Sequence, residues 1–172
     1  MTRTGYRASQ FVQALFAQPA ADDARLAAEH LPPALQPLFY TLSQAEQAHS
    51  VAVLRSLLQQ GQRDPDLLAA ALLHDVGKTR APLRLFDRVL AVLARRFAPA
   101  AADAWGEGAP RGWSRPFVVA ARHADWGGDI LEQAGASPRL VAMVRRHHAP
   151  QPTCGTEADR LLAALQAADG SH

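Results

Sequence analysis

One segment constrains the fold more than any other: seven consecutive apolar residues that end directly in a histidine and an aspartate. The run from Leu67 to Leu73 follows Asp64-Pro65-Asp66, which supplies an N-cap, a proline at the first helical position and an acid that favours the helix dipole. Gly77 follows, and glycine suits the left-handed conformation that ends many helices. The segment therefore predicts a short buried helix at the centre of the protein, with His74 and Asp75 at its end.

The composition predicts that the other elements are helical as well. The 172 residues include 36 Ala and 22 Leu, against 10 Val and one Ile. Alanine and leucine lose little freedom in a helix, whereas β-branched side chains fit strands better. The length suits a single domain. We therefore expect an all-α fold, a compact helical bundle formed by one domain over residues 1–172.

Helix start and stop signals recur along the chain, separated by short stretches rich in proline and glycine. Ser43 and Glu46 form a capping-box pattern at one of these starts. The segment 99–115, rich in Ala, Gly and Pro, is expected to be a long loop. Besides the buried helix and a short helix before Ser43, we expect helices over residues 6–18, 22–31, 43–60, 83–98, 116–123, 125–134, 137–148 and 156–169.

The basic residues are unevenly distributed. The net charge is +2, but Lys78 to Arg146 contains 12 basic and 6 acidic residues, and Lys78 is the one lysine among 18 basic residues. Such a segment can attract phosphates or acidic lipids, but without interleaved aromatics it gives little support for nucleic-acid binding. The most apolar candidate helix, 83–98, has five charged residues, too many for a membrane span. A helix lying on a membrane surface stays open.

Cysteine usage and the N-terminus predict the compartment. Cys154 is the one cysteine, so no internal disulfide can form, which favours a reducing cytoplasm. Residues 1–7 are polar and lead into no long apolar stretch, so we expect no signal peptide. We therefore expect a cytoplasmic protein, and no pattern in the chain selects an oligomeric state.

Imidazole and carboxylate groups gather at the predicted helix ends, and His49 lies two turns into another predicted helix. Imidazoles and carboxylates together suit divalent first-row metals. If the helix ends converge, their negative dipole ends favour a cation between them. Each residue alone is better explained as a helix cap or a core histidine, but the set predicts a candidate two-metal site. The set comprises His49, His74, Asp75, His123, His147 and Asp169.

This ordered series resembles the HD superfamily of metal-dependent phosphohydrolases. The motif residues are His49, Leu72-Leu73-His74-Asp75-Val76-Gly77-Lys78, His123, His147 and Ala168-Asp169. The stretch from Leu73 to Lys78 matches the H-D-[IV]-G-K form of the superfamily, and the resemblance covers residues 43–170. It implies a metal-binding core over 43–170, with residues 1–42 as a helical N-terminal extension packed on it.

The resemblance also implies a ligand set for two divalent ions, drawn from Fe, Mn, Zn, Ni, Co or Mg. His49, His74, Asp75 and Asp169 correspond to the ligands of the first ion. His123 and His147 correspond to the extra histidines of the binuclear branch, in which Asp75 bridges both ions. Adjacent helical residues point about 100° apart, so His148 joins His147 only if the helix frays there. We therefore rank His147 as a ligand and His148 as an outer or substrate contact.

The implied activity is hydrolysis of a phosphoester or phosphoanhydride of a nucleotide-like small molecule by metal-activated water. Asp75 and Lys78 are the expected catalytic residues. Lys78, Arg80, Arg84 and His148 are the expected contacts of a small phosphorylated substrate, although Arg80 and Arg84 are better explained as surface arginines. Two alternatives stay open: a di-iron oxygenase of the same superfamily, and a non-catalytic signalling or binding module.

Overall fold

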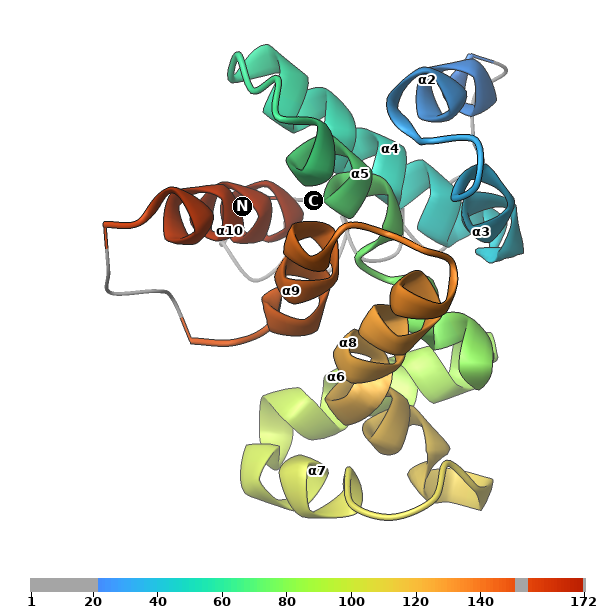
Figure 1. Cartoon of the computed structure of the whole chain (residues 1–172). Helices are drawn as coiled ribbons and strands as arrows, with labels where there is room; N and C mark the ends of the chain where they lie inside the picture. The colour runs from blue at the N-terminus through green and yellow to red at the C-terminus, as the bar shows by residue number, and fades with distance from the viewer. Residues whose placement is uncertain (1–21, 151–154, 172) are drawn as a thin grey trace, which may run out of the picture.

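The structure is a computed structural model that describes residues 22–150 and 155–171 (Figure 1). The helix expected over 6–18 and Cys154 therefore lie outside the described residues. Within them the regular secondary structure consists of helices and includes no strand. The prediction of an all-α helical bundle is confirmed.

The helices follow one another with short connections, and among those described none combines the length and apolarity needed to cross a membrane. Two of the elements are short 3₁₀ helices, labelled η. In chain order the elements are α2 (Asp23–His30), α3 (Gln36–Thr41), α4 (Gln44–Gln59), α5 (Pro65–Leu73), η1 (Val76–Arg80), α6 (Leu85–Phe97), α7 (Pro99–Trp105), η2 (Gly112–Ser114), α8 (Arg115–Gln133), α9 (Pro138–Arg146) and α10 (Glu157–Asp169).

Four of these helices begin at the capping residues that the sequence indicates. The Ser43 hydroxyl accepts the backbone N–H of Glu46, and the Glu46 carboxylate accepts the backbone N–H of Ser43, which completes the capping box. Asp64, Ser137 and Thr156 each accept a backbone N–H from the residue three positions later. Such caps satisfy amide groups that the helix itself leaves without partners.

The main hydrophobic core surrounds α5. Residues 67–73 of this helix are all buried, and α4, α9 and α10 pack around it (Figure 1). Apolar residues of α2 and α3, among them Ala27 and Phe39, belong to the same core. Burying one large aliphatic side chain contributes roughly 1.5–3 kcal/mol, so this run anchors the bundle. The prediction of a central buried helix is confirmed.

The segment expected to be a long loop is largely helical, so that prediction is wrong. It contains α7, which opens with Pro99 at its first position, and η2. The rings of Trp105, Trp113 and Phe117 pack edge to face, with centroids 5.1–6.2 Å apart. Together with α6 these elements form an outer lobe, defined here as residues 82–115, which lies beside the first half of α8 and away from α5 (Figure 1).

Two further predictions about helices are wrong. Residues 115–133 form one helix, α8, rather than two, so His123 lies in its middle and not at a helix end. α9 ends at Arg146 instead of His148. The expected convergence of helix C-termini therefore applies to α5, α9 and α10 and not to α8.

Gly77 has a different role from the one expected. The φ angle of Gly77 is not positive, so the residue does not adopt the left-handed conformation. A Cβ added at Gly77 would lie 1.9 Å from the carbonyl oxygen of His123 and 2.5 Å from the amide nitrogen of Gly127. Glycine at this position allows η1 to approach the backbone of α8 directly beside His123.

Candidate metal centre

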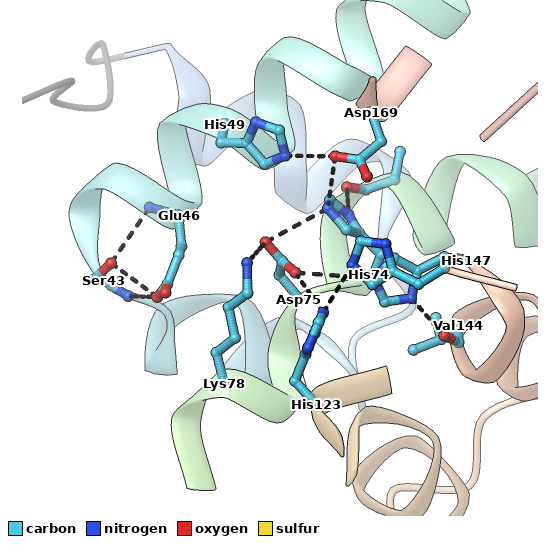
Figure 2. Close-up of polar contacts among 12 residues, drawn as sticks. Ser43, Glu46, His49, His74, Asp75, Lys78, His123, Val144, His147 and Asp169 are labelled. Atoms are coloured by element: carbon cyan, nitrogen blue, oxygen red, sulfur yellow. Dashed lines mark hydrogen bonds and ion pairs between the residues drawn. The ribbon is translucent and has the colours of Figure 1, made fainter. Parts of the chain in front are cut away.

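The candidate ligands come from separate parts of the chain and meet at one place (Figure 2). Most of them lie at or just after helix ends, whereas His49 and His123 lie within helices. His49 lies in α4, His74 follows the last residue of α5, Asp75 and Lys78 flank the start of η1, His123 lies in α8, His147 and His148 follow α9, and Asp169 ends α10.

Asp75 lies at the centre of the group and is almost fully buried. Its Oδ2 lies 2.5 Å from Lys78 Nζ and 3.6 Å from His74 Nε2. Its Oδ1 lies 3.4 Å from His123 Nε2 and 4.0 Å from His147 Nε2. Burial opposes ionisation, but Lys78 and the surrounding imidazoles outweigh it and hold the pKa of Asp75 well below its usual value. One carboxylate oxygen, Oδ2, thus faces His74 and the other, Oδ1, faces His123 and His147.

The first set of candidate ligands is formed by His49, His74 and Asp169, whose candidate ligand atoms all lie within 4.8 Å of one another. Asp169 Oδ1 lies 2.9 Å from His49 Nε2 and 3.5 Å from His74 Nε2. Burial opposes ionisation of Asp169, but the hydrogen bond from His49 and the neighbouring His74 imidazole lower its pKa further than burial raises it. Burial likewise disfavours a charged His74, but Asp75 and Asp169 raise its pKa overall. We call this set the first cluster.

The second cluster consists of His123, His147 and His148, whose candidate ligand atoms also lie within 4.8 Å of one another. The Nε2 atoms of His123 and His148 are 3.1 Å apart. Burial is the largest influence here and lowers the pKa of His123 to about 4 and that of His147 to about 3. Both imidazoles are therefore neutral at pH 7, the state in which histidine binds metals.

Backbone hydrogen bonds orient three of the imidazoles. The Nδ1 atoms of His74, His123 and His147 lie 3.0, 2.9 and 2.6 Å from carbonyl oxygens one turn earlier in the chain. Since a carbonyl can only accept, each Nδ1 carries a proton, and in the neutral ring each Nε2 then presents a lone pair to the cluster. The same arrangement fixes the ring and tautomer of metal-ligating histidines.

The surroundings of two of these Nε2 atoms indicate whether a metal ion fits the site. The Nε2 atoms of His74 and His147 are buried and have no hydrogen-bond partner within the described residues. A buried polar atom left without a partner costs about 1–3 kcal/mol, and native proteins rarely contain one without a reason. A cation between the imidazoles and Asp75 would satisfy both nitrogens. The donor set therefore fits divalent metal ions.

The turn after α9 places His147 and His148 side by side. Ala149 donates its N–H to the Arg146 carbonyl over 2.8 Å, so the chain leaves the helix before the two histidines can diverge. From α10, Gln166 Nε2 lies 3.3 Å from the Arg146 carbonyl oxygen and 2.9 Å from that of Ala149. The helix thus ends before His147, which is the condition under which His147 and His148 can face one cluster. The candidate ligand atoms of both residues lie near that of His123.

Gln166 was not among the residues singled out from the sequence. Its amide holds backbone carbonyls 17 and 20 residues earlier in the chain. A contact with backbone atoms depends on no particular side-chain partner, so no motif or spacing in the sequence marks it.

The three basic residues expected to contact a phosphorylated substrate lie in different surroundings. Lys78 contacts Asp75 within the group of ligands. Arg80 instead pairs with Asp129 on α8 over 3.4 Å, and the exposed Arg84 donates its backbone N–H to Asp87 at the start of α6. Among the described residues, no contact joins Arg80 or Arg84 to the histidines.

Comparison with known proteins identifies the family. Residues 47–172 match the family model described as HD domain. No curated protein and no solved structure matches the chain. The matched region covers most of the chain and begins two residues before His49, so it includes every candidate metal ligand. The chain belongs to the HD domain family, the superfamily of metal-dependent phosphohydrolases that its ordered histidines and aspartates resemble.

Proposed function

We propose that the protein is a metal-dependent phosphohydrolase that cleaves a phosphoester or phosphoanhydride of a nucleotide-like small molecule. The observation that carries this proposal is the position of Asp75 between two three-residue clusters, with one oxygen facing each. Imidazole nitrogens turned inward around a shared carboxylate are the arrangement that a pair of divalent ions needs.

The two clusters divide the proposed ligands. His49, His74 and Asp169 would hold the first ion and His123 and His147 the second, with Asp75 shared and His148 at the exposed rim as a further ligand or substrate contact. Mixed nitrogen and oxygen donors favour Fe, Mn, Zn, Ni or Co over Mg, which prefers oxygen alone. When bound, such ions lower the pKa of a coordinated water and neutralise charge on phosphoryl oxygens.

Lys78 is the residue best placed to meet a phosphoryl group. Its side chain is 31% exposed while its ammonium contacts buried Asp75, so Lys78 lies between the candidate metal ligands and the solvent. Lysine is a compact point charge, and a positive charge held at the transferring phosphoryl group stabilises the transition state. Arg80 adds positive charge nearby in the sequence, and its 44% exposed pair with Asp129 is weak enough to be exchanged for a phosphate.

A panel of substrates and metals tests the proposal. The purified chain is loaded with each of the six candidate metals and assayed on a phosphomonoester, a phosphodiester, a nucleoside triphosphate and a dinucleoside polyphosphate, with metal content measured on the same samples. We expect hydrolysis of one class, and loss of both metal and activity in His74→Ala. His30→Ala is the matched control, because His30 lies in α2 and belongs to neither cluster. Hydrolysis retained by His74→Ala would overturn the proposal.

Lys78→Arg separates phosphate contact from metal binding. We expect an unchanged metal content and a kcat roughly 100-fold lower, because the planar guanidinium keeps the charge but cannot take the position of the compact ammonium. Oxygen consumption by the iron-loaded protein, with no phosphate released from any substrate, would favour the oxygenase instead. A metal content of one ion per chain would remove His123 and His147 from the ligand set.

A further inference from the structure

Helix α6 carries an apolar stripe that faces solvent. Phe86, Leu93 and Phe97 are spaced by seven and four residues, so they share one side of the helix. Their exposed fractions are 73%, 49% and 77%. No residue of α6 whose side chain the structure describes is buried, so this helix contributes little to the hydrophobic core. Two phenylalanines that are three-quarters exposed protrude from the molecule.

The outer lobe has aromatic side chains beyond this stripe. Trp113 is 62% exposed and Trp105 is 37% exposed, although both pack against Phe117. Tryptophan combines a large apolar ring with an N–H donor and is favoured where one side of a surface is apolar and the other is wet. The lobe thus exposes aromatic surface on these tryptophans as well as on α6.

The charge of the outer lobe selects the partner. Residues 82–115 contain six arginines and three acidic residues, a net +3, whereas the rest of the chain carries −1 of the total +2. Arg84 precedes the first turn of α6, and the exposed Arg96 lies 5.6 Å from the Phe97 ring near its end. Two such lobes would repel each other, which disfavours a second copy as the occupant, and an anionic surface complements the charge.

We infer that α6 and its flanking arginines dock the protein on an anionic lipid surface. A helix with aromatic and leucine side chains on one side and arginine near the apolar side is the pattern of a helix that lies in the interface of a bilayer. Protruding phenylalanines enter the region between headgroups and acyl chains, while arginines meet the lipid phosphates. This inference rests on the outer lobe and is independent of the metal centre.

Vesicle sedimentation of the full chain tests the inference. We expect binding to vesicles with about 30% phosphatidylglycerol in phosphatidylcholine, at least roughly tenfold stronger than to phosphatidylcholine alone, and weakened by salt. Phe86→Ser combined with Phe97→Ser should reduce binding by about tenfold or more. Tyr40→Ser is the matched control, because Tyr40 is an aromatic residue 53% exposed on α3, outside the lobe. It should bind like the wild type.

A second variant and a second measurement separate docking from misfolding. Arg96→Glu should weaken binding to the anionic vesicles without changing the melting temperature, since Arg96 is exposed. Sedimentation velocity without lipid should give a monomer. Failure to bind anionic vesicles, binding unchanged in the double phenylalanine variant, or a dimer that the double variant dissociates would each overturn the inference.

Discussion

Gly77→Ala tests how the metal centre is assembled. The substitution adds one methyl group, and the nearest atoms to the new Cβ are the His123 carbonyl oxygen at 1.9 Å and the Gly127 amide nitrogen at 2.5 Å. Both belong to the backbone of α8, which cannot rotate away as a side chain can. Since ordinary contact begins at 3.4 Å, η1 and α8 must separate by about 1.5 Å.

The separation should reduce both stability and metal binding. Inserting a methyl group into a close-packed contact costs about 1–3 kcal/mol, and contact with backbone atoms, which cannot rotate away, points to the upper half of that range. For a chain of this length, a loss of 2–3 kcal/mol lowers Tm by roughly 4–12 °C. Asp75 and Lys78 flank Gly77, so a shift of this size also exceeds the roughly 0.5 Å within which a preorganised site keeps its function.

Urea unfolding and metal analysis on the same protein check both effects. Gly155→Ala is the matched control, because a Cβ at Gly155 meets no atom within 4 Å, and its free energy of unfolding should change by no more than about 0.5 kcal/mol. If Gly77→Ala keeps the stability of this control and still binds two ions, then close approach of η1 and α8 does not explain the glycine.

Three further changes probe other parts of the structure. Gln166→Ala removes the amide that holds the turn around His147 and His148, so the Kd of the second metal, measured by titration, should rise about tenfold; an unchanged Kd would show that the turn holds itself. Ser50→Ala replaces a buried hydroxyl that has no hydrogen-bond partner among the described residues, so urea unfolding should show a gain of about 1 kcal/mol, and a loss would reveal a hidden partner. When free metal is present at 100 times its Kd, adding a chelator should lower the free energy of unfolding by about 2.7 kcal/mol, measured as a lower Tm. An unchanged Tm would contradict a metal that binds the folded state and not the unfolded state.

The helix starts and the core could be predicted because their causes are local. Ser43, Asp64, Ser137 and Thr156 cap helices through amide groups three residues away, and the apolar run of α5 is continuous in the sequence. The HD-type series was visible for the same reason, since each motif residue has its own fixed position in the chain. The pairing of the donors into two clusters was implied by the resemblance, whereas their distances and burial came from the structure.

The wrong predictions concern places where packing between distant segments overrides local preference. The break expected after His123 does not occur, and α8 continues through this point to Gln133. The Ala-rich segment 99–115 has weak helical signals of its own, and α7 forms where it packs against α6 and α8. In both places the helix is stabilised by packing against segments distant in the sequence, which local helix propensity does not report.

Two glycines of α8, like Gly77, lie where a neighbouring segment packs too closely for a larger residue. Glycine inside a helix costs roughly 0.5–1 kcal/mol relative to alanine, so two in succession need a compensating contact. A Cβ at Gly127 would lie 3.1 Å from Val144 Cγ1, and one at Gly128 would lie 2.3 Å from Arg145 Cγ. Both neighbours belong to α9, and Arg145 crosses α8 there to reach Asp129 and Glu132.

Close packing of three segments therefore assembles the candidate metal centre. Gly77 brings the backbone of η1 against that of α8 beside His123, and Gly127 and Gly128 leave room for the Val144 and Arg145 side chains of α9 on the next turn of the same helix. Asp75 is carried by the first of these segments and His147 by the second, so neither could lie within 4.0 Å of the other if larger residues held the segments apart. The motif supplies the ligands, but residues without side chains determine whether the ligands meet.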